Sequence, residues 1–154
     1  MFTQAQIEEM IDLLVTLSKD TKVYIGSDST RFLDKGRWYA SYATVCVIHK
    51  NGSNGSRIFV VKSTEPDYDL KASRPSMRMM NEAIKSAEAY VQLAPFLDEF
   101  PIEIHADISK DPKHGSNCAA QAAAGYILGV TGIEPKLKPN SWSASSAADW
   151  AARI

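Results

Sequence analysis

The sequence predicts an α/β fold in which a mixed β-sheet carries helices on its faces. Two observations support this prediction. Three strand-like segments follow one another in the first half of the chain, and helix-like and strand-like segments alternate after them. Three consecutive strands indicate an antiparallel meander, and a helix then crosses over to a fourth strand. The complete predicted order is α-β-β-β-α-β-α-β-α, which gives five strands preceded by one extra N-terminal helix.

The first half of the chain begins with a helix at residues 3–18. Thr3 and Gln6 match a capping box, and apolar residues recur at helical spacing as far as Leu17. Gly36 marks a turn between two strand-like segments. Strands rich in β-branched and aromatic residues are expected at residues 22–28, 37–50 and 57–62.

The second half alternates helices with strands. A helix is predicted at residues 76–92, and prolines at positions 95 and 101 close that region. Its apolar face, at spacings of three and four, consists of Met77, Met80, Ile84, Ala87 and Val91. The remaining predicted elements are a strand at 102–108, an alanine-rich helix at 116–128, a short fifth strand at 134–138 and a last helix from 143 or 145 to 153.

Length and composition indicate one globular domain. The 154 residues are enough to bury a core, with 45% hydrophobic and 23% charged residues. The sequence contains no internal repeat and no segment with the composition of a linker. Residues 1–154 are therefore predicted as a single domain, with the N-terminal helix in residues 1–19 and the core in residues 20–154.

Charge and hydropathy limit the classes of partner. The net charge of −1 excludes a strong overall attraction to nucleic acid or to an anionic membrane, so a nucleic-acid site must rest on a local basic patch. The first 18 residues carry three acidic side chains and no basic leader, which argues against a signal peptide. No apolar run approaches the ~18 residues of a membrane helix. We expect a cytoplasmic protein with no membrane partner.

Two aspartates each end an apolar, strand-like segment. Asp28 closes the segment that starts at Val23, and Asp107 follows a segment with alternating isoleucines. If these strands are neighbours, the two carboxylates converge, and a divalent cation is the usual remedy for their repulsion. The simpler interpretations have equal weight at this point: Asp28 can begin a turn, and Asp107 can belong to a solvent-facing polar edge.

Two further carboxylates lie in predicted helices. Glu82 falls off the main apolar stripe of its helix, and by itself it is best interpreted as a solvated helix glutamate. Asp149 interrupts a run of small residues that indicates close packing of the last helix on the sheet. A buried aspartate there needs a partner, and a metal ion would serve, but a simple surface aspartate remains open.

Basic and aromatic residues gather in two predicted loops. Lys113 and His114 follow the fourth strand, and Lys138 and Trp142 precede the last helix. The lysines and the histidine suit contacts with phosphates, and the tryptophan offers a stacking surface. Ordinary solvated loops explain the same residues at least as well.

Five segments make the chain similar to a known family. They are residues 24–29, 78–82, 105–108, 113–117 and 138–149, of which the last is the most distinctive. Together they resemble the ribonuclease-H-like fold and, more specifically, the uncharacterised YkuK-type family of bacteria and phages. The resemblance covers about residues 20–153. It implies that Asp28, Glu82, Asp107 and Asp149 occupy the four acidic positions at which nucleases of this fold hold metal.

The expected function is a metal-dependent nuclease that hydrolyses phosphodiester bonds in DNA or RNA. In this hypothesis the four acidic residues hold two Mg²⁺ or Mn²⁺ ions about 3.5–4 Å apart. Lys113, His114, Lys138 and Trp142 are the expected substrate contacts. Two alternatives remain: a non-catalytic nucleic-acid-binding or assembly module on the same fold, and a phosphohydrolase of small phosphate esters.

Overall fold

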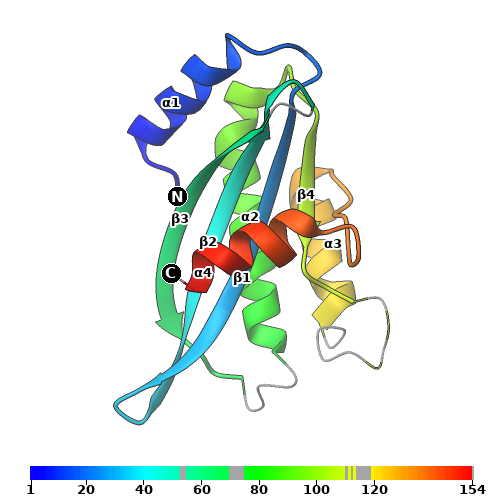
Figure 1. Ribbon diagram of the computed structural model, residues 1–154. Helices are drawn as coiled ribbons and strands as arrows, with labels where there is room; N and C mark the ends of the chain where they lie inside the picture. The colour runs from blue at the N-terminus through cyan, green and yellow to red at the C-terminus, as the bar shows by residue number, and fades with distance from the viewer. Residues whose placement is uncertain (53–54, 70–74, 110, 112, 114–118, 154) are drawn as a thin grey trace.

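The computed structural model describes residues 1–52, 55–69, 75–109, 111, 113 and 119–153, which form a four-stranded sheet packed between helices (Figure 1). The strands are β1 (Lys22–Asp34), β2 (Arg37–His49), β3 (Ser56–Pro66) and β4 (Ile102–Ala106). The helices are α1 (Gln4–Leu14), α2 (Ser76–Leu97), α3 (Ala120–Thr131) and α4 (Asp149–Arg153). A 3₁₀ turn, η1 (Lys50–Gly52), and a π-helical turn, η3 (Ser143–Ala148), complete the elements.

The sheet is mixed, as the sequence predicts. Its strand order is β3-β2-β1-β4, with β1–β2 and β2–β3 antiparallel and β1–β4 parallel. The parallel pair forms because α2 crosses from the end of β3 back to the start of β4, which is the connection that parallel strands require. The predicted α/β architecture is therefore confirmed.

The predicted fifth strand is reduced to a single β-bridge. Lys136 makes a single parallel bridge with His105 on the outer side of β4. The backbone of Lys136 donates to Ile104 and accepts from Ala106, at 2.8 and 2.9 Å. Pro135 and Pro139 flank this contact, and a proline has no N–H to continue a ladder. The described part of the chain consequently has four strands in the sheet.

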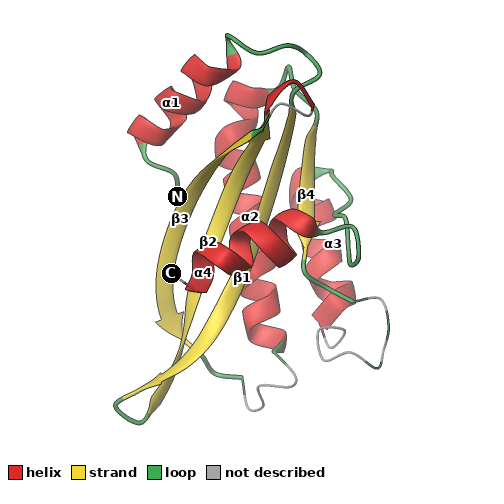
Figure 2. Cartoon of the chain, in the orientation of Figure 1, coloured by secondary structure: helices red, strands yellow, loops and turns green. Residues whose placement is uncertain are grey.

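Helices cover both faces of the sheet with different packing (Figure 2). One face meets α1, α2 and α3 in the larger hydrophobic core, which includes Ile25, Leu93 and Ile104. The other face meets η3 and α4 through a smaller cluster of alanines. The capping box of α1 is present as predicted, with the Thr3 hydroxyl accepting from the Gln6 backbone.

Two predicted elements differ from the structure in extent or orientation. β1 continues six residues past Asp28, because residues 29–34 pair with β2 up to a turn at Lys35 and Gly36. α2 continues through Pro95 to Leu97, and its buried face differs from the predicted one. Met77 and Val91 are 45% and 55% exposed, and the buried face combines small residues such as Ala83 with Met79, Leu93 and Leu97.

No described helix combines the length and the apolar character that crossing a membrane would need.

Candidate active site

The parallel pairing of β1 with β4 brings the two strand aspartates to the same level. Ser27 pairs with Ala106, so Asp28 and Asp107 each follow one residue beyond the last paired position. Asp107 directly follows β4, as predicted. Asp28 lies in the middle of β1 and is 8% exposed, so the turn interpretation of this residue is wrong.

Helices on opposite faces of the sheet contribute one carboxylate each to the same place. Glu82 lies on α2 and is half-buried, and Asp149 is the first residue of α4. The Asp28 side chain is hydrogen-bonded to both Glu82 and Asp149. Asp107 is close enough for its charge to act on Asp28 and on Glu82. The structure therefore brings together all four acidic residues singled out from the sequence.

The hydrogen bonds order the carboxyl groups by proton affinity. Burial raises the pKa of Glu82 well above its ordinary value, and the charge of Asp28 and a hydrogen bond to it raise it further. Burial also raises the pKa of Asp28 to about 7; the hydrogen bond with Glu82 acts against this rise and the one with Asp149 adds to it. A hydrogen bond favours the charged form of its acceptor and the neutral form of its donor. Among the three groups, Glu82 and Asp28 therefore have raised pKa values and Asp149 a lowered one.

Asp149 ends this chain of carboxyl groups as the ionised member. Burial acts to raise the pKa of Asp149, but the Arg153 guanidinium and the hydrogen bond from Asp28 outweigh it and hold the pKa below its ordinary value. Arg153 Nε lies 3.1 Å from both carboxylate oxygens of Asp149, one helical turn away. Only one of the three linked carboxyl groups thus has a basic partner of its own.

Lys138 contacts the fourth carboxylate. Its Nζ lies 3.2 Å from Oδ1 of Asp107, whose side chain is 21% exposed. That Oδ1 atom is nevertheless buried and receives no hydrogen bond from the described residues. The sequence predicts Lys138 as a substrate contact, and in the structure this lysine reaches the acidic cluster itself.

Two residues that the sequence analysis did not single out link the cluster to the rest of α2. The Ser29 hydroxyl donates to Glu82 at 3.2 Å, and Arg78 Nη1 donates to the Ser29 hydroxyl at 3.3 Å. Arg78 and Glu82 are four residues apart on one helix, so they share a face. In the sequence, its four-residue spacing from Glu82 could have pointed to Arg78. The contact with Ser29 could not be predicted, because it depends on packing between distant segments.

A buried histidine and an aromatic pair hold the turn that precedes Asp149. His105 is 2% exposed, and its Nδ1 accepts a hydrogen bond from the Ser143 backbone at 3.1 Å. Burial lowers the pKa of His105, so the ring is neutral and can accept at Nδ1. Tyr24 and Trp142 pack beside it, with ring centroids 4.7 Å apart. η3 is thereby attached to β1 and β4 where α4 begins.

The other predicted substrate contacts have different positions. Trp142 is 39% exposed but packs one edge on Tyr24 and His105. Lys113 is exposed, and its backbone N–H donates to Asp111. His114 lies outside the described residues.

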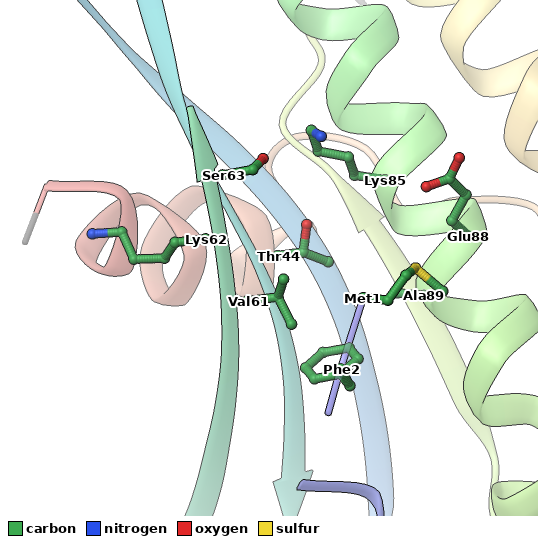
Figure 3. Close-up of a pocket in the computed structure, with 9 residues that line it drawn as sticks. All are labelled: Met1, Phe2, Thr44, Val61, Lys62, Ser63, Lys85, Glu88 and Ala89. Carbon is green, nitrogen blue, oxygen red and sulfur yellow. The ribbon is translucent and has the colours of Figure 1, made fainter. Parts of the chain in front are cut away.

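Two cavities lie on the α2 side of the sheet. A cavity of about 140 Å³ is enclosed by the N-terminus, β2, β3 and α2, and its lining includes Phe2, Lys85 and Glu88 (Figure 3). It contains none of the four acidic residues. A much smaller cavity of about 10 Å³ is lined by Glu82 and Asp107, which is about the space of one water molecule. The acidic cluster is therefore compact, with little internal space beside it.

The carboxylates do not form a closed metal site as they stand. Within the part of the chain that the structure describes, no three His, Cys, Asp or Glu side chains have the spacing of metal ligands. Glu82 and Asp149 instead lie near enough to Asp28 for each to shift its pKa.

Comparison with known proteins gives one match. A family model described as ribonuclease H-like matches residues 4–153, which covers every strand and all four acidic residues. No curated protein and no solved structure matches the chain.

Proposed function

Because the chain belongs to the ribonuclease H-like family, we propose that it is a metal-dependent nuclease whose acidic cluster binds Mg²⁺ or Mn²⁺ and hydrolyses phosphodiester bonds. One observation carries the proposal: carboxylates from α2, the end of β4 and α4 lie near enough to Asp28 on β1 to shift its pKa. A fold that needed only stability would not gather four acids with so few cations, because like charges repel and burial costs more. We also propose that the chain belongs to the YkuK-type branch of this family.

The donor set suits a hard divalent cation. All four side chains offer carboxylate oxygens, which are the ligands that Mg²⁺ and Mn²⁺ prefer. Oδ1 of Asp107 is buried and lies 3.2 Å from Lys138 Nζ, so it becomes available as a ligand when that lysine moves away. When two ions are bound, they activate a water molecule and stabilise the leaving oxygen.

The residues of the chain have separate roles in this proposal. Asp28 and Asp107 are the most direct ligands, and Glu82 and Asp149 complete the two positions. Asp28 and Glu82 lose their protons when they bind a cation, and Lys138 leaves Asp107 to contact the substrate phosphate. Ser29 orients Glu82 through its hydroxyl, at 3.2 Å.

Hydrolysis of labelled polymers tests the proposal. Single-stranded DNA, single-stranded RNA, duplex DNA and an RNA–DNA hybrid are incubated with the full chain and Mg²⁺ or Mn²⁺. We expect Glu82→Gln to lower the rate at least about a hundredfold, since bound metal contributes several kcal/mol to the transition state. Glu88→Gln is the matched control, because Glu88 is an exposed glutamate of the same helix. Equal rates for the two variants, or no hydrolysis of any polymer, would contradict the proposal.

A non-catalytic module that binds nucleic acid or serves in assembly is the second candidate. The absence of closed metal spacing in the described residues, and the lysine that already contacts Asp107, favour it. A metal titration separates the two candidates. A nuclease gains thermal stability with Mn²⁺ and loses this gain in Asp28→Asn, whereas the non-catalytic module shows no metal-dependent shift. Turnover of small phosphate esters without polymer cleavage would indicate a phosphohydrolase instead.

A further inference from the structure

The β1–β2 hairpin extends past the helices on both sides of the sheet (Figure 1). Its strands stay paired up to Asp34 and Arg37, six residues beyond Asp28. Lys35 and Gly36 form the turn, with φ angles of 49° and 78°. Lysine is an unusual residue at such an angle, which asparagine, aspartate or glycine adopts more easily. The tip thus carries a positive charge at a position that other residue types adopt more easily.

Register assigns the hairpin side chains to the two faces of the sheet. Asp28 pairs with Ala43, which packs in the cluster beneath α4, so Asp28 lies on the α4 face. Side chains alternate along a strand, which puts Thr30 and Phe32 on that same face. Their partners Ser41 and Tyr39 are on it as well. An unbroken strip of sheet surface therefore runs from the acidic cluster to the end of the hairpin.

An aromatic pair lies on this strip. The rings of Phe32 and Tyr39 are 5.8 Å apart and nearly parallel, at 22°. Phe32 is 37% exposed, and α4 does not cover it. Four residues separate it from Asp28 along β1, which corresponds to about 13 Å at the rise of a strand. The exposed Phe32 ring and the half-buried Tyr39 ring can stack on bases next to a phosphodiester held at the carboxylates.

Basic residues border the same strip. Lys62 pairs with Ala43 and so belongs to the same face, and Figure 3 shows its side chain pointing away from Phe2 and Val61. Arg37 is exposed at the end of the hairpin, next to Lys35. Asp34 is the acidic residue at this end of the face. The basic residues outnumber it, as expected for a surface that follows a phosphate backbone.

We propose that this strip, consisting of Thr30, Phe32, Arg37, Tyr39, Ser41 and Lys62, binds single-stranded nucleic acid and leads it to the acidic cluster. The inference rests on the proposed function for its class of substrate. Bases stack on Phe32 and Tyr39, and phosphates meet Arg37 and Lys62. Single strands fit better than duplexes, because bases in a duplex present no free face to an aromatic ring.

Fluorescence anisotropy in EDTA tests this binding without hydrolysis. The full chain is titrated into labelled single-stranded DNA, single-stranded RNA and duplex DNA of about 12 nucleotides. The double variant Phe32→Ala/Tyr39→Ala should weaken single-strand binding at least about fivefold, since stacking contributes that much per base. Leu33→Ala is the matched control, because Leu33 is a 56%-exposed residue of the same hairpin on the opposite face. Its affinity should stay within about twofold of wild type.

If loss of the aromatic pair impairs folding, a second variant still tests the inference. Lys62→Gln changes an exposed side chain, and we expect it to reduce the slope of log affinity against log salt by about one. An unchanged slope overturns the inference, as do equal losses in the aromatic and Leu33 variants, or no binding of single strands. A dimer that the aromatic double variant dissociates, seen by analytical ultracentrifugation, also overturns it.

The outcomes separate this inference from the nuclease proposal. Single-strand binding that depends on the aromatic pair, without any hydrolysis, supports the strip and contradicts the nuclease. Hydrolysis with a KM that the aromatic double variant leaves unchanged supports the nuclease and overturns the strip.

Discussion

Two groups of buried carboxylates lie about one helical turn apart along α2, and the protein neutralises them differently. Asp67 and Asp69 have side chains that are 0% and 2% exposed. Arg31 Nε lies 2.5 Å from Asp67, and Arg78 contacts both aspartates at 3.8 and 4.0 Å. Asp69 also accepts from the backbone N–H groups of Met77 and Arg78, at 2.8 and 3.1 Å. This group, the capped cluster, has two arginines and a helix N-terminus for two acids.

Among the described residues, the acidic cluster around Asp28 has no such compensation. Asp28 and Glu82 have raised pKa values, and the cations that contact the cluster, Lys138 and Arg153, reach Asp107 and Asp149. The capped cluster shows that the fold can pair buried acids with arginines when only stability is required. The lack of a described arginine partner for Asp28 and Glu82 therefore supports a role in which a cation arrives from outside. Opposite responses to mutation should separate the two groups.

The largest effect is expected in the capped cluster. Arg31→Met should lower the free energy of unfolding by about 3–5 kcal/mol, because it leaves the buried Asp67 carboxylate without its closest cation. Chemical denaturation measures the change. Arg57→Met is the control, since Arg57 pairs with Glu9 at 2.8 Å on the surface, and its loss should cost less than about 1 kcal/mol. Similar losses in the two variants would show that the buried pair stabilises the fold no more than the surface pair does.

Asp28→Asn should have the opposite effect and raise the free energy of unfolding at high pH. The pKa of Asp28 is raised from 3.8 to about 7 on folding, so the folded state holds its proton more tightly than the unfolded chain. The resulting stability is present below pH 4 and is lost as pH rises to about 7. In EDTA at pH 8, the variant should be more stable than wild type by on the order of 2 kcal/mol, because each pKa unit corresponds to about 1.4 kcal/mol.

Denaturation of both proteins between pH 4 and 8 checks this prediction. Wild type should lose stability as pH rises through this window, and Asp28→Asn should lose less. Asp98→Asn, which changes an exposed residue at the end of α2, should follow the wild-type curve. A destabilised Asp28→Asn at pH 8 without metal would show that the carboxylate is already compensated.

Metal should reverse this pH dependence. A cation competes with the proton on Asp28, so Mn²⁺ affinity should fall about tenfold for each pH unit below 7. In stability terms this is about 1.4 kcal/mol per unit at a fixed Mn²⁺ concentration. Thermal unfolding with Mn²⁺ at pH 6 and pH 8 measures it, with K⁺ at equal ionic strength as the control. A thermal shift of the same size at pH 6 and pH 8 would indicate that Mn²⁺ binds away from Asp28.

The smallest effect concerns the link between the two clusters. Ser29→Ala removes the hydroxyl that donates to Glu82 and accepts from Arg78, at a cost of about 1 kcal/mol. The hydrogen bond lowers the pKa of Glu82, so its loss should move the onset of Mn²⁺ binding to higher pH. Ser63→Ala is the control, because Ser63 donates to Glu65 far from the cluster. If Mn²⁺ binding begins at the same pH in Ser29→Ala and Ser63→Ala, Ser29 does not orient Glu82.

Local pattern pointed to the strand aspartates and to Asp149, whereas Glu82 was selected only through the family resemblance. Asp107 ends a strand that is evident from alternating isoleucines, and Asp149 follows a run of small residues. The face of α2 was predicted wrongly, since large apolar residues such as Met77 suggested a core stripe. The helix instead buries the side that carries Met79, Ala83 and Leu93, and of the predicted stripe only Ala87 is fully buried.

Local sequence patterns could not predict contacts between distant segments. The continuation of β1 beyond Asp28 depends on pairing with residues 37–42, and its polar residues alone do not predict a strand. The salt bridge from Arg31 to Asp67 joins segments 36 positions apart, and periodicity carries no signal for such a pair.

Strand and helix propensities and their periods act over a few neighbouring residues, so they were enough to predict the order of elements and the mixed sheet, while the family resemblance selected the four acidic residues. Packing of the chain sets which acids lie around Asp28 and which are paired with arginine. Those properties depend on burial and on charges that arrive from other elements, and both arise only when the chain packs. The same holds for the strip from Phe32 to Asp28, where the alternation of β1 is local but the open face beside α4 is not.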